Sequence, residues 1–300
     1  MSRGRVFVVG SLHYDIVLNA PHLPARDETV MGENVQFVCG GKGGNQAVAA
    51  AQHGADVSFA GAVGKDFFAD ALLDNLAKCG LETGQILRHD GSASGMSVAI
   101  VEPSGDYGAV VASGANQRLN ASNIDIPTDT SCLILQNEIP EDVNIVIADR
   151  AKKMGAQVVL NAAPMRTLPT ALLQNIDVLI VNRVEAAAFF HQSMETIGDA
   201  EAALDKSTLP CPAIIITLGG DGLVFSSTDE RPHHVPAASV ETISSHGAGD
   251  AFVGALCSQL VARRPLEDSL KYASAAAALH ILTPVDKRSE IGPVDVSKLV

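Results

Sequence analysis

Residues 244–256 read SSHGAGDAFVGAL and carry the strongest local signal in the 300-residue sequence. Gly247, Ala248 and Gly249 are small residues that open a segment whose apolar residues recur with the period of a helix. The first N–H groups of a helix have no partner within it, and the helix dipole adds partial positive charge there. These three residues are therefore predicted to form an anion hole at the start of a helix.

Asp250 lies in the first turn of the same helix, beside the predicted anion hole. A carboxylate is a weak partner for a phosphate, but it can accept a proton from a hydroxyl that attacks one. A tight turn followed by an ordinary acidic residue in a first turn would give the same letters. Whether Asp250 is a catalytic proton acceptor or an ordinary first-turn residue depends on which other residues the chain brings to this helix.

Outside this stretch, apolar runs of strand length alternate with helical segments. Runs that are apolar on both faces are typical of a parallel sheet covered by helices on each side. Helical periodicity occupies 45–54, 66–80, 141–155, 248–262 and 266–282. The alternation predicts an α/β fold, a three-layer αβα arrangement with a mostly parallel central sheet. The predicted strands are 5–10, 57–64, 131–136, 156–161, 178–182 and 213–219.

Two segments interrupt this alternation, residues 14–38 and 95–112. Both contain short strand-like pieces with turn residues and no helix between them. They predict a small antiparallel sheet, too thin to bury a core alone, that covers an edge or a cleft of the main body. No linker, repeat or low-complexity tract divides the sequence, so residues 1–300 are predicted to form one domain.

Composition narrows the function classes. The chain has 21 Lys and Arg against 34 Asp and Glu, a formal net charge of −13, which disfavours nucleic acid and anionic membranes as partners. Five scattered cysteines give neither a disulfide framework nor a zinc knuckle. A secretory signal and an apolar stretch of 18 or more residues are both lacking, so we predict a cytoplasmic enzyme.

The second motif, residues 39–47, reads CGGKGGNQA. Gly41 and Gly43 allow a ligand to approach the backbone, Lys42 brings positive charge, and Asn45 offers donor and acceptor atoms suited to sugar hydroxyls. A glycine-rich hinge is the alternative interpretation. The Walker pattern and a helix-opening G-x-G-x-x-G after the first strand are both missing, so P-loop and dinucleotide sites lose their support.

Polar residues also follow several predicted strands at their carboxyl ends. His13 and Asp15 follow the first strand, where a carboxylate can accept bonds from two sugar hydroxyls. Open α/β sheets bind ligands at this edge, so the strand ends together predict a cleft. The others are Glu138, Asn182, Glu185 and the run TLGGDG at 217–222.

In this order and spacing, the motifs resemble the ribokinase-like carbohydrate kinase family, from Val6 to about Leu282. The resemblance implies transfer of the γ-phosphoryl group of ATP to a primary hydroxyl of ribose or a related small sugar, with Mg²⁺. Asp250 would be the general base and Gly247 to Gly249 the anion hole. The small sheet would be a lid over the sugar and the contact of a homodimer.

The resemblance also implies individual site roles. Glu185 would order Mg²⁺ through water. The sugar would be held by His13, Asp15, Gly41, Lys42, Gly43, Asn45, Glu138 and Asp250. The nucleotide would be held by Asn182, Glu185, Thr217, Gly219, Gly222, Gly249 and Ser274.

The sequence departs from the family pattern at three places, one of which is the small-residue G-A turn normally found after the last long helix, which is missing from Thr283 to Ser289. Ser244 stands where such proteins have an aspartate that holds potassium, and His246 lies in the same loop. A neutral hydroxyl holds a monovalent cation more weakly than a carboxylate, so we predict little potassium dependence. His13 stands where asparagine is typical, which changes the shape and hydrogen bonding near the sugar.

Two alternatives stay open. A nucleoside kinase of the same family needs the same catalytic end and differs mainly around His13 and residues 95–112. A non-catalytic sugar- or nucleotide-binding relative belongs to a different class. Asp250 disfavours that class, because a binding protein needs no proton acceptor beside an anion hole.

Overall fold

The computed structural model describes residues 4–103, 107–228, 230–238, 240 and 245–299. Within them, a nine-stranded main sheet has the order β13-β12-β11-β10-β9-β8-β1-β4-β5, and the seven strands from β11 to β5 pair in parallel. The predicted mostly parallel sheet is confirmed. Its strands are β1 Arg5–Val9, β4 Asp56–Gly64, β5 Glu82–His89, β8 Thr130–Gln136, β9 Gln157–Asn161, β10 Val178–Asn182, β11 Ala213–Thr217, β12 Leu223–Ser227 and β13 His233–Val235.

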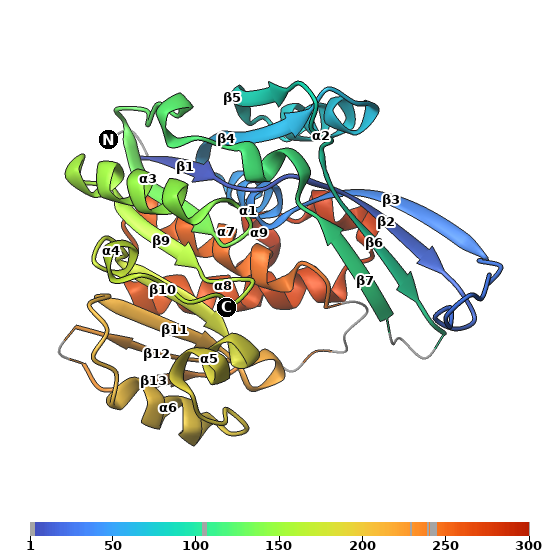
Figure 1. The fold of residues 1–300 in the computed structure, drawn as a ribbon. Coiled ribbons are helices and arrows are strands. Elements are labelled where there is room, and N and C mark those ends of the chain that lie inside the picture. The colour runs from blue at the N-terminus through green and yellow to red at the C-terminus, as the bar shows by residue number, and fades with distance from the viewer. Residues whose placement is uncertain (1–3, 104–106, 229, 239, 241–244, 300) are drawn as a thin grey trace.

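Helices cover both faces of this sheet, so the three-layer arrangement is also confirmed (Figure 1). The cause is visible in β1, where Phe7 and Val9 pack into one core and Val6 and Val8 into the other. The first core includes α3 Glu141–Lys153, α4 Thr170–Leu173, α5 Arg183–Phe190 and α6 Ile197–Asp205. The second includes α1 Lys42–Gln52, α2 Phe67–Lys78, α7 Ala248–Val261, α8 Leu266–Leu282 and α9 Pro293–Val296.

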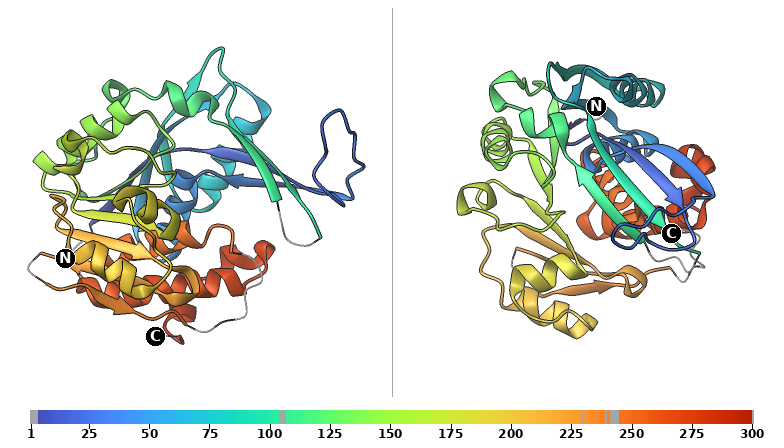
Figure 2. Two further views of the ribbon diagram at one scale, coloured as in Figure 1. Left: turned by 60° about the horizontal axis from the view of Figure 1, so that its bottom comes forward. Right: turned by 45° about the vertical axis from the view of Figure 1, so that its right-hand side comes forward.

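A second, four-stranded sheet has the order β3-β2-β6-β7 and projects from the main body (Figure 2). It consists of β2 His13–Asn19, β3 Asn34–Gly40, β6 Gly95–Val101 and β7 Tyr107–Ala112. β2 and β3, like β6 and β7, are antiparallel, whereas the central pair β2 and β6 is parallel. β2 follows β1 in the chain, and β6 follows β5. Because β1 and β5 run in the same direction in the main sheet, β2 and β6 leave that sheet at the same edge and in the same direction, which accounts for their parallel pairing.

The seam between the two sheets is tightly built. A Cβ added to Gly41, which has φ +87°, would lie 2.7 Å from the backbone nitrogen of His13, so only glycine fits there. Asn116, in the 3₁₀ helix η1 Gly114–Arg118, accepts a bond from the Leu12 N–H at 3.0 Å and donates to the Leu12 carbonyl at 2.8 Å. The first turn after β1 is therefore fixed where the small sheet begins.

The predicted helix at 45–54 begins earlier, at Lys42, because the glycine-rich loop itself supplies its first turn. No helix in the described part of the chain is long and apolar enough to cross a membrane.

Candidate active site

Asp250 lies in the first turn of α7 and is only 8% exposed. Two amide side chains of α1 hold its carboxylate: Gln46 Nε2 donates to Oδ1 at 2.8 Å and Asn45 Nδ2 donates to Oδ2 at 3.1 Å. These bonds cross between two helices that are about 200 residues apart in the chain. The carboxylate is therefore oriented by α1 and not by its own helix.

Burial raises the pKa of Asp250 above that of an ordinary aspartate. The positive charge of Lys42 and the amide donors of Gln46 and Asn45 oppose this increase, and the negative charge of Glu138 adds to it. A raised pKa makes the ionised carboxylate a stronger proton acceptor. The surroundings thus suit a general base.

The start of α7 has the geometry of an anion hole. Gly247 adopts a left-handed conformation, φ 80° and ψ 0°, and in the described structure no side chain caps the helix start. A Cβ added to Gly249 would meet no atom within 4 Å, so the space beside this turn is open. The first N–H groups of α7 can accordingly meet an anion from solvent.

Glu138 follows β8, at the same edge of the sheet. Its Oε2 accepts a bond from the Lys42 N–H at 2.9 Å, at the start of α1, and a hydrogen bond from the Ser11 hydroxyl. His13 Nδ1 lies 3.9 Å from the same oxygen, and the His13 side chain is 4% exposed. The motifs after β1, before α1 and after β8 therefore meet at one carboxylate.

Side chains donate hydrogen bonds to three successive backbone carbonyls around Glu138. Arg166 Nη1 donates to the Asn137 oxygen at 3.4 Å and to the Ile139 oxygen at 3.0 Å, and Gln117 Nε2 donates to the Glu138 oxygen at 3.1 Å. The guanidinium of Arg166 is charged, and hydrogen bonds from a charged donor are stronger than those from a neutral one such as the Gln117 amide. The loop after β8 is consequently held from two sides.

Asp15 lies two residues beyond His13 in β2, so both side chains share one face of the small sheet. Ser97 Oγ donates to Asp15 Oδ1 at 2.5 Å, across the parallel pair β2 and β6. A Cβ on Gly40 would lie 2.1 Å from Asp15 Oδ2, so the glycine leaves room for the carboxylate.

The predicted nucleotide residues lie after β10 and β11. Asn182 and Glu185 cap α5 reciprocally: the Glu185 N–H donates to Asn182 Oδ1, and the Asn182 N–H donates to Glu185 Oε2, both at 2.9 Å. Burial raises the pKa of Glu185, which is 7% exposed, Lys42 lowers it and Asp250 raises it. The charges of Lys42 and Asp250 therefore act on the Glu185 carboxylate.

The turn after β11 is fixed by backbone geometry. The Leu218 N–H donates to the Gly222 carbonyl at 2.7 Å, and a Cβ on Gly222, with φ +89°, would lie 2.1 Å from the Val235 oxygen. Thr217 pairs with Asn182 across neighbouring strands, while Gly219 begins the turn with φ +64° and open space around it.

Ser274 is the predicted residue that the structure connects least. It lies half-buried in α8, and in the described part of the chain it forms no side-chain hydrogen bond to the other predicted nucleotide residues.

Several residues that the sequence interpretation did not single out complete the site. Gln46 stands inside the motif CGGKGGNQA, and Ser11 lies two residues before His13 after the first strand, so these polar residues in and beside the predicted site were an available signal. The others come from distant segments with no motif of their own: Ser97, Asn116, Gln117 and Arg166.

The described residues contain no group of three or more His, Cys, Asp or Glu side chains that could hold a metal ion alone. Mg²⁺ usually takes one or two carboxylates together with phosphate oxygens and water. Glu185, whose ionised form is disfavoured by burial and by Asp250, fits such a partial site, because a cation nearby would offset both effects. Ser244, the first predicted residue of a monovalent-cation site, lies outside the described residues.

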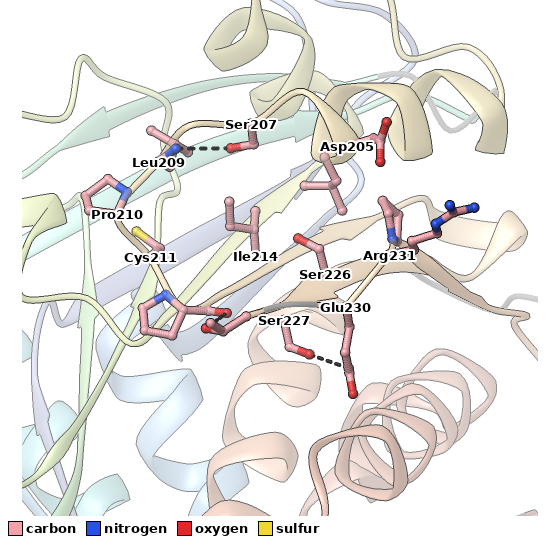
Figure 3. Close-up of a pocket in the computed structure, with 14 residues that line it drawn as sticks. Asp205, Ser207, Leu209, Pro210, Cys211, Ile214, Ser226, Ser227, Glu230 and Arg231 are labelled. Atoms are coloured by element: carbon pink, nitrogen blue, oxygen red, sulfur yellow. Dashed lines mark hydrogen bonds between the residues drawn. The ribbon is translucent and has the colours of Figure 1, made fainter.

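A pocket of about 540 Å³ lies away from the candidate active site, near the start of β11 and the end of α6 (Figure 3). Ile214, Ser226 and Arg231 are among its lining residues, and the Ser227 hydroxyl donates to Glu230. Ile214 is at the beginning of β11, whereas the site residue Thr217 is at its end. The pocket contains none of the predicted site residues.

The family model described as pfkB family carbohydrate kinase matches residues 3–289. The chain belongs to this family. As a pfkB-family protein it is an ATP-dependent sugar kinase, a phosphotransferase, as the order of its motifs predicts.

Named relatives agree with this membership. Ribokinase of Haemophilus influenzae is 32% identical over 93% of this chain and 92% of its own length. Deoxyribokinase of Salmonella typhimurium is 30% identical, covering 92% of each chain. The solved structure of Arabidopsis thaliana ribokinase complexed with ribose and ATP superposes with a TM-score of 0.91 at 27% identity, covering 99% of both chains. Within the pfkB family, the loop GGKGGNQA at 40–47 predicts a likeness to ribokinase, which these relatives confirm.

Proposed function

We propose that this kinase transfers the γ-phosphoryl group of ATP to a primary hydroxyl of ribose or a closely related pentose. One observation carries the mechanism: the buried Asp250 carboxylate is held by Asn45 and Gln46 at the uncapped start of α7. A proton acceptor and an anion hole then lie within a single helical turn, as a phosphoryl transfer to a hydroxyl requires.

In this mechanism Asp250 accepts the proton of the sugar hydroxyl as its oxygen attacks the γ-phosphorus. The bond from that phosphorus to the bridging oxygen of ADP breaks, and ADP leaves with the bonding electrons. The N–H groups at Gly247, Ala248 and Gly249 stabilise the negative charge of the transferred group. Lys42, whose charge already acts on Asp250 and Glu185, adds a positive charge to the same region.

The proposed sugar site combines two rigid parts. Glu138, fixed by Ser11 and the Lys42 N–H, belongs to the main body, whereas Asp15, fixed by Ser97, belongs to the small sheet. A sugar bound between them closes the small sheet over the site as a lid, which excludes water from the transfer. His13, Gly41, Gly43 and Asn45 complete the proposed set of sugar contacts.

The proposed nucleotide side consists of the ends of β10 and β11. Glu185 would hold Mg²⁺ through water, and the ion would supply positive charge to offset the ATP phosphates. Asn182, Thr217, Gly219, Gly222 and Ser274 complete the proposed nucleotide contacts. The cytoplasm stays the predicted location.

Two relatives support the substrate class. The Arabidopsis thaliana structure holds ribose and ATP, and the Salmonella typhimurium relative is named a deoxyribokinase. Ribose and 2-deoxyribose differ by one hydroxyl, and a site built to bond a hydroxyl discriminates strongly against its loss.

The test is ADP release by the purified protein with Mg²⁺ across pentoses, hexoses, 2-deoxyribose and nucleosides. We expect a pentose to give the highest kcat/KM. A nucleoside as the best acceptor would replace this proposal with a nucleoside kinase, and sugar binding without ADP release would indicate a non-catalytic relative.

Replacing Asp15 tests the assignment of the sugar side. Asp15→Ala removes an acceptor for sugar hydroxyls, so we expect the sugar KM to rise by about tenfold or more, while the ATP KM stays within about twofold. Asp149→Ala, on the solvent side of α3, is the matched control. A weakened ATP KM with an unchanged sugar KM would show that Asp15 serves the nucleotide instead.

We also propose that residues 1–300 form one domain and that two copies pair through the small sheet. One face of that sheet is apolar across all four strands, and Phe37 and Val110 on it are 57% and 75% exposed. A second copy offers the same face, so the pairing is self-complementary.

A further inference from the structure

The carbonyl of His246, the residue before Gly247, accepts hydrogen bonds from two side chains. Arg288 Nη1 donates to it at 2.9 Å and His280 Nε2 at 3.2 Å. His280 lies near the end of α8, and Arg288 lies in the 3₁₀ helix η4 Val285–Glu290. The loop that opens the proposed anion hole is thus held by the segment that follows α8.

Arg288 is itself fixed from several directions. Its Nε donates to the Thr283 carbonyl at 3.1 Å, and its own carbonyl accepts from Gln52 Nε2 at 3.2 Å and from the Ile291 N–H at 3.3 Å. The guanidinium therefore bridges the end of α8 and the His246 carbonyl, while the end of α1 holds the backbone. A guanidinium stays charged at any pH of interest, so this bridge is a permanent positive charge.

This arrangement does not fit the monovalent cation that the family resemblance implies for the same loop. A carbonyl oxygen has two lone pairs, and both directions at His246 are taken by N–H donors. A second cation at that oxygen would also face the guanidinium at close range, where like charges repel strongly. His280 is neutral near pH 7, because burial and the Arg288 charge lower its pKa to about 4.

We propose that Arg288 is a positioning residue that serves as the fixed cation of the anion-hole loop, in place of a bound monovalent ion. The guanidinium holds the His246 carbonyl and with it the peptide before Gly247, whose left-handed conformation aims the first N–H groups of α7. This inference rests on the proposed role of Gly247 to Gly249 and extends it to a residue outside the motif.

The first test uses the unaltered protein. Turnover is measured with Mg²⁺, ATP and the best sugar in sodium, potassium or N-methylglucamine chloride at constant ionic strength. We expect kcat to change by less than about twofold, because the cationic position is already filled. A saturable rise in kcat with potassium would overturn the proposal. An absence of ADP release with every acceptor would instead refute the proposed kinase reaction.

The second test removes the guanidinium. For Arg288→Met we expect kcat to fall by about 10- to 100-fold, the scale of a misplaced catalytic group, with the sugar KM within about twofold. Arg288→Lys should lose less, and millimolar guanidinium chloride should restore part of the kcat of Arg288→Met, which an equal concentration of sodium chloride should not. Lys287→Ala removes a neighbouring exposed charge and should behave as the unaltered protein.

Two outcomes of the second test would contradict the proposal. An Arg288→Met protein with an unaltered kcat would show that the loop needs no cation. A loss of kcat that guanidinium leaves untouched, together with a lowered melting temperature, would assign Arg288 a structural role only. If Arg288→Met fails to fold, the proposal can still be refuted, because a saturable rise in kcat with potassium in the unaltered protein overturns it and Arg288→Lys repeats the second test with a cationic side chain.

Discussion

At the scale of single residues, the side chain on which the proposed chemistry depends is Asp250, whose carboxylate is buried and bonded by two amides. Asp250→Asn keeps the shape of the side chain but cannot accept the substrate proton. We expect kcat to fall by about 10²-fold or more, with ATP affinity and melting temperature nearly unchanged. Single-turnover kinetics and ATP titration of the variant check this. A kcat close to that of the unaltered protein would mean that another group is the base.

The amide of Gln46 should control the pH at which the site works. Its bond to Asp250 favours the ionised carboxylate and so lowers a pKa that burial raises. Gln46→Leu should therefore raise the pKa of Asp250 further. Because the base works in its ionised form, activity is lost as the pH falls through this pKa, and the loss should begin at a higher pH in the variant.

The pH profile of kcat/KM is the measurement for Gln46→Leu. Gln174→Leu, an exposed replacement of the same kind, should leave the profile unchanged. An acid limb that stays in place or moves to lower pH would refute the proposed influence of Gln46 on Asp250.

Sequence interpretation singled out Asp250, Asn45, Lys42 and Glu138, because each stands in or beside a motif whose residue types suit phosphoryl transfer or sugar binding, and the structure brings these residues close together. It did not find that Gln46 rather than Asn45 makes the shorter bond to Asp250. That choice depends on how α1 lies against α7, and a contact between residues about 200 positions apart leaves no periodic signal in the chain.

At the scale of helices and strands, the contact of α1 with α7 brings the amides to the carboxylate. Gly254 lies one turn after Asp250, on the same face of α7. A Cβ added to it would lie 2.5 Å from Ala49 Cβ and 2.6 Å from both the Ala50 nitrogen and the Gln46 oxygen. Two of these neighbours are backbone atoms of α1, so the helices would have to separate.

Gly254→Ala should lower the free energy of unfolding by about 1–3 kcal/mol, as overpacking does. It should also lower kcat, because the separation lengthens the bonds from α1 to Asp250. Chemical denaturation and steady-state kinetics measure the two effects. Gly84→Ala, in the edge strand β5, has open space for its Cβ and is the control. Equal stability of the two variants would contradict the assigned packing.

The periodic elements were the predictable part of the fold. The six runs proposed from apolarity correspond to β1, β4, β8, β9, β10 and β11. The predicted helical segments 45–54 and 66–80 end on Gly54 and Gly80, whose φ values of +83° and +78° are those of the left-handed conformation that often follows a helix. Strands β5, β12 and β13 of the main sheet and the parallel pairing of β2 with β6 were not predicted. β5 is an edge strand whose residues are mostly half-exposed, so its apolar pattern is weak.

At the scale of the whole molecule, the proposed dimer depends on the outer face of the small sheet. Phe37→Lys together with Val110→Lys puts charge into that face, so we expect the mass in solution to fall from twice 31.2 kDa to 31.2 kDa. Light scattering after size-exclusion chromatography measures it. Val146→Lys, an exposed replacement on α3, should leave the mass unchanged. An unaltered protein that is already monomeric would refute the pairing.

The position of β1 in the main sheet has a consequence for biosynthesis. β1 pairs with β4 on one side, but on the other side Val6 pairs with Cys132, more than a hundred residues further along the chain. Ribosomes add about 5–20 residues per second, so one edge of this apolar strand has no partner for roughly 6–25 s during translation. An unpaired apolar edge is a template for aggregation. The yield of folded kinase should therefore be more sensitive to chaperones and to translation speed while the residues before β8 are being synthesised than while the residues after β8 are.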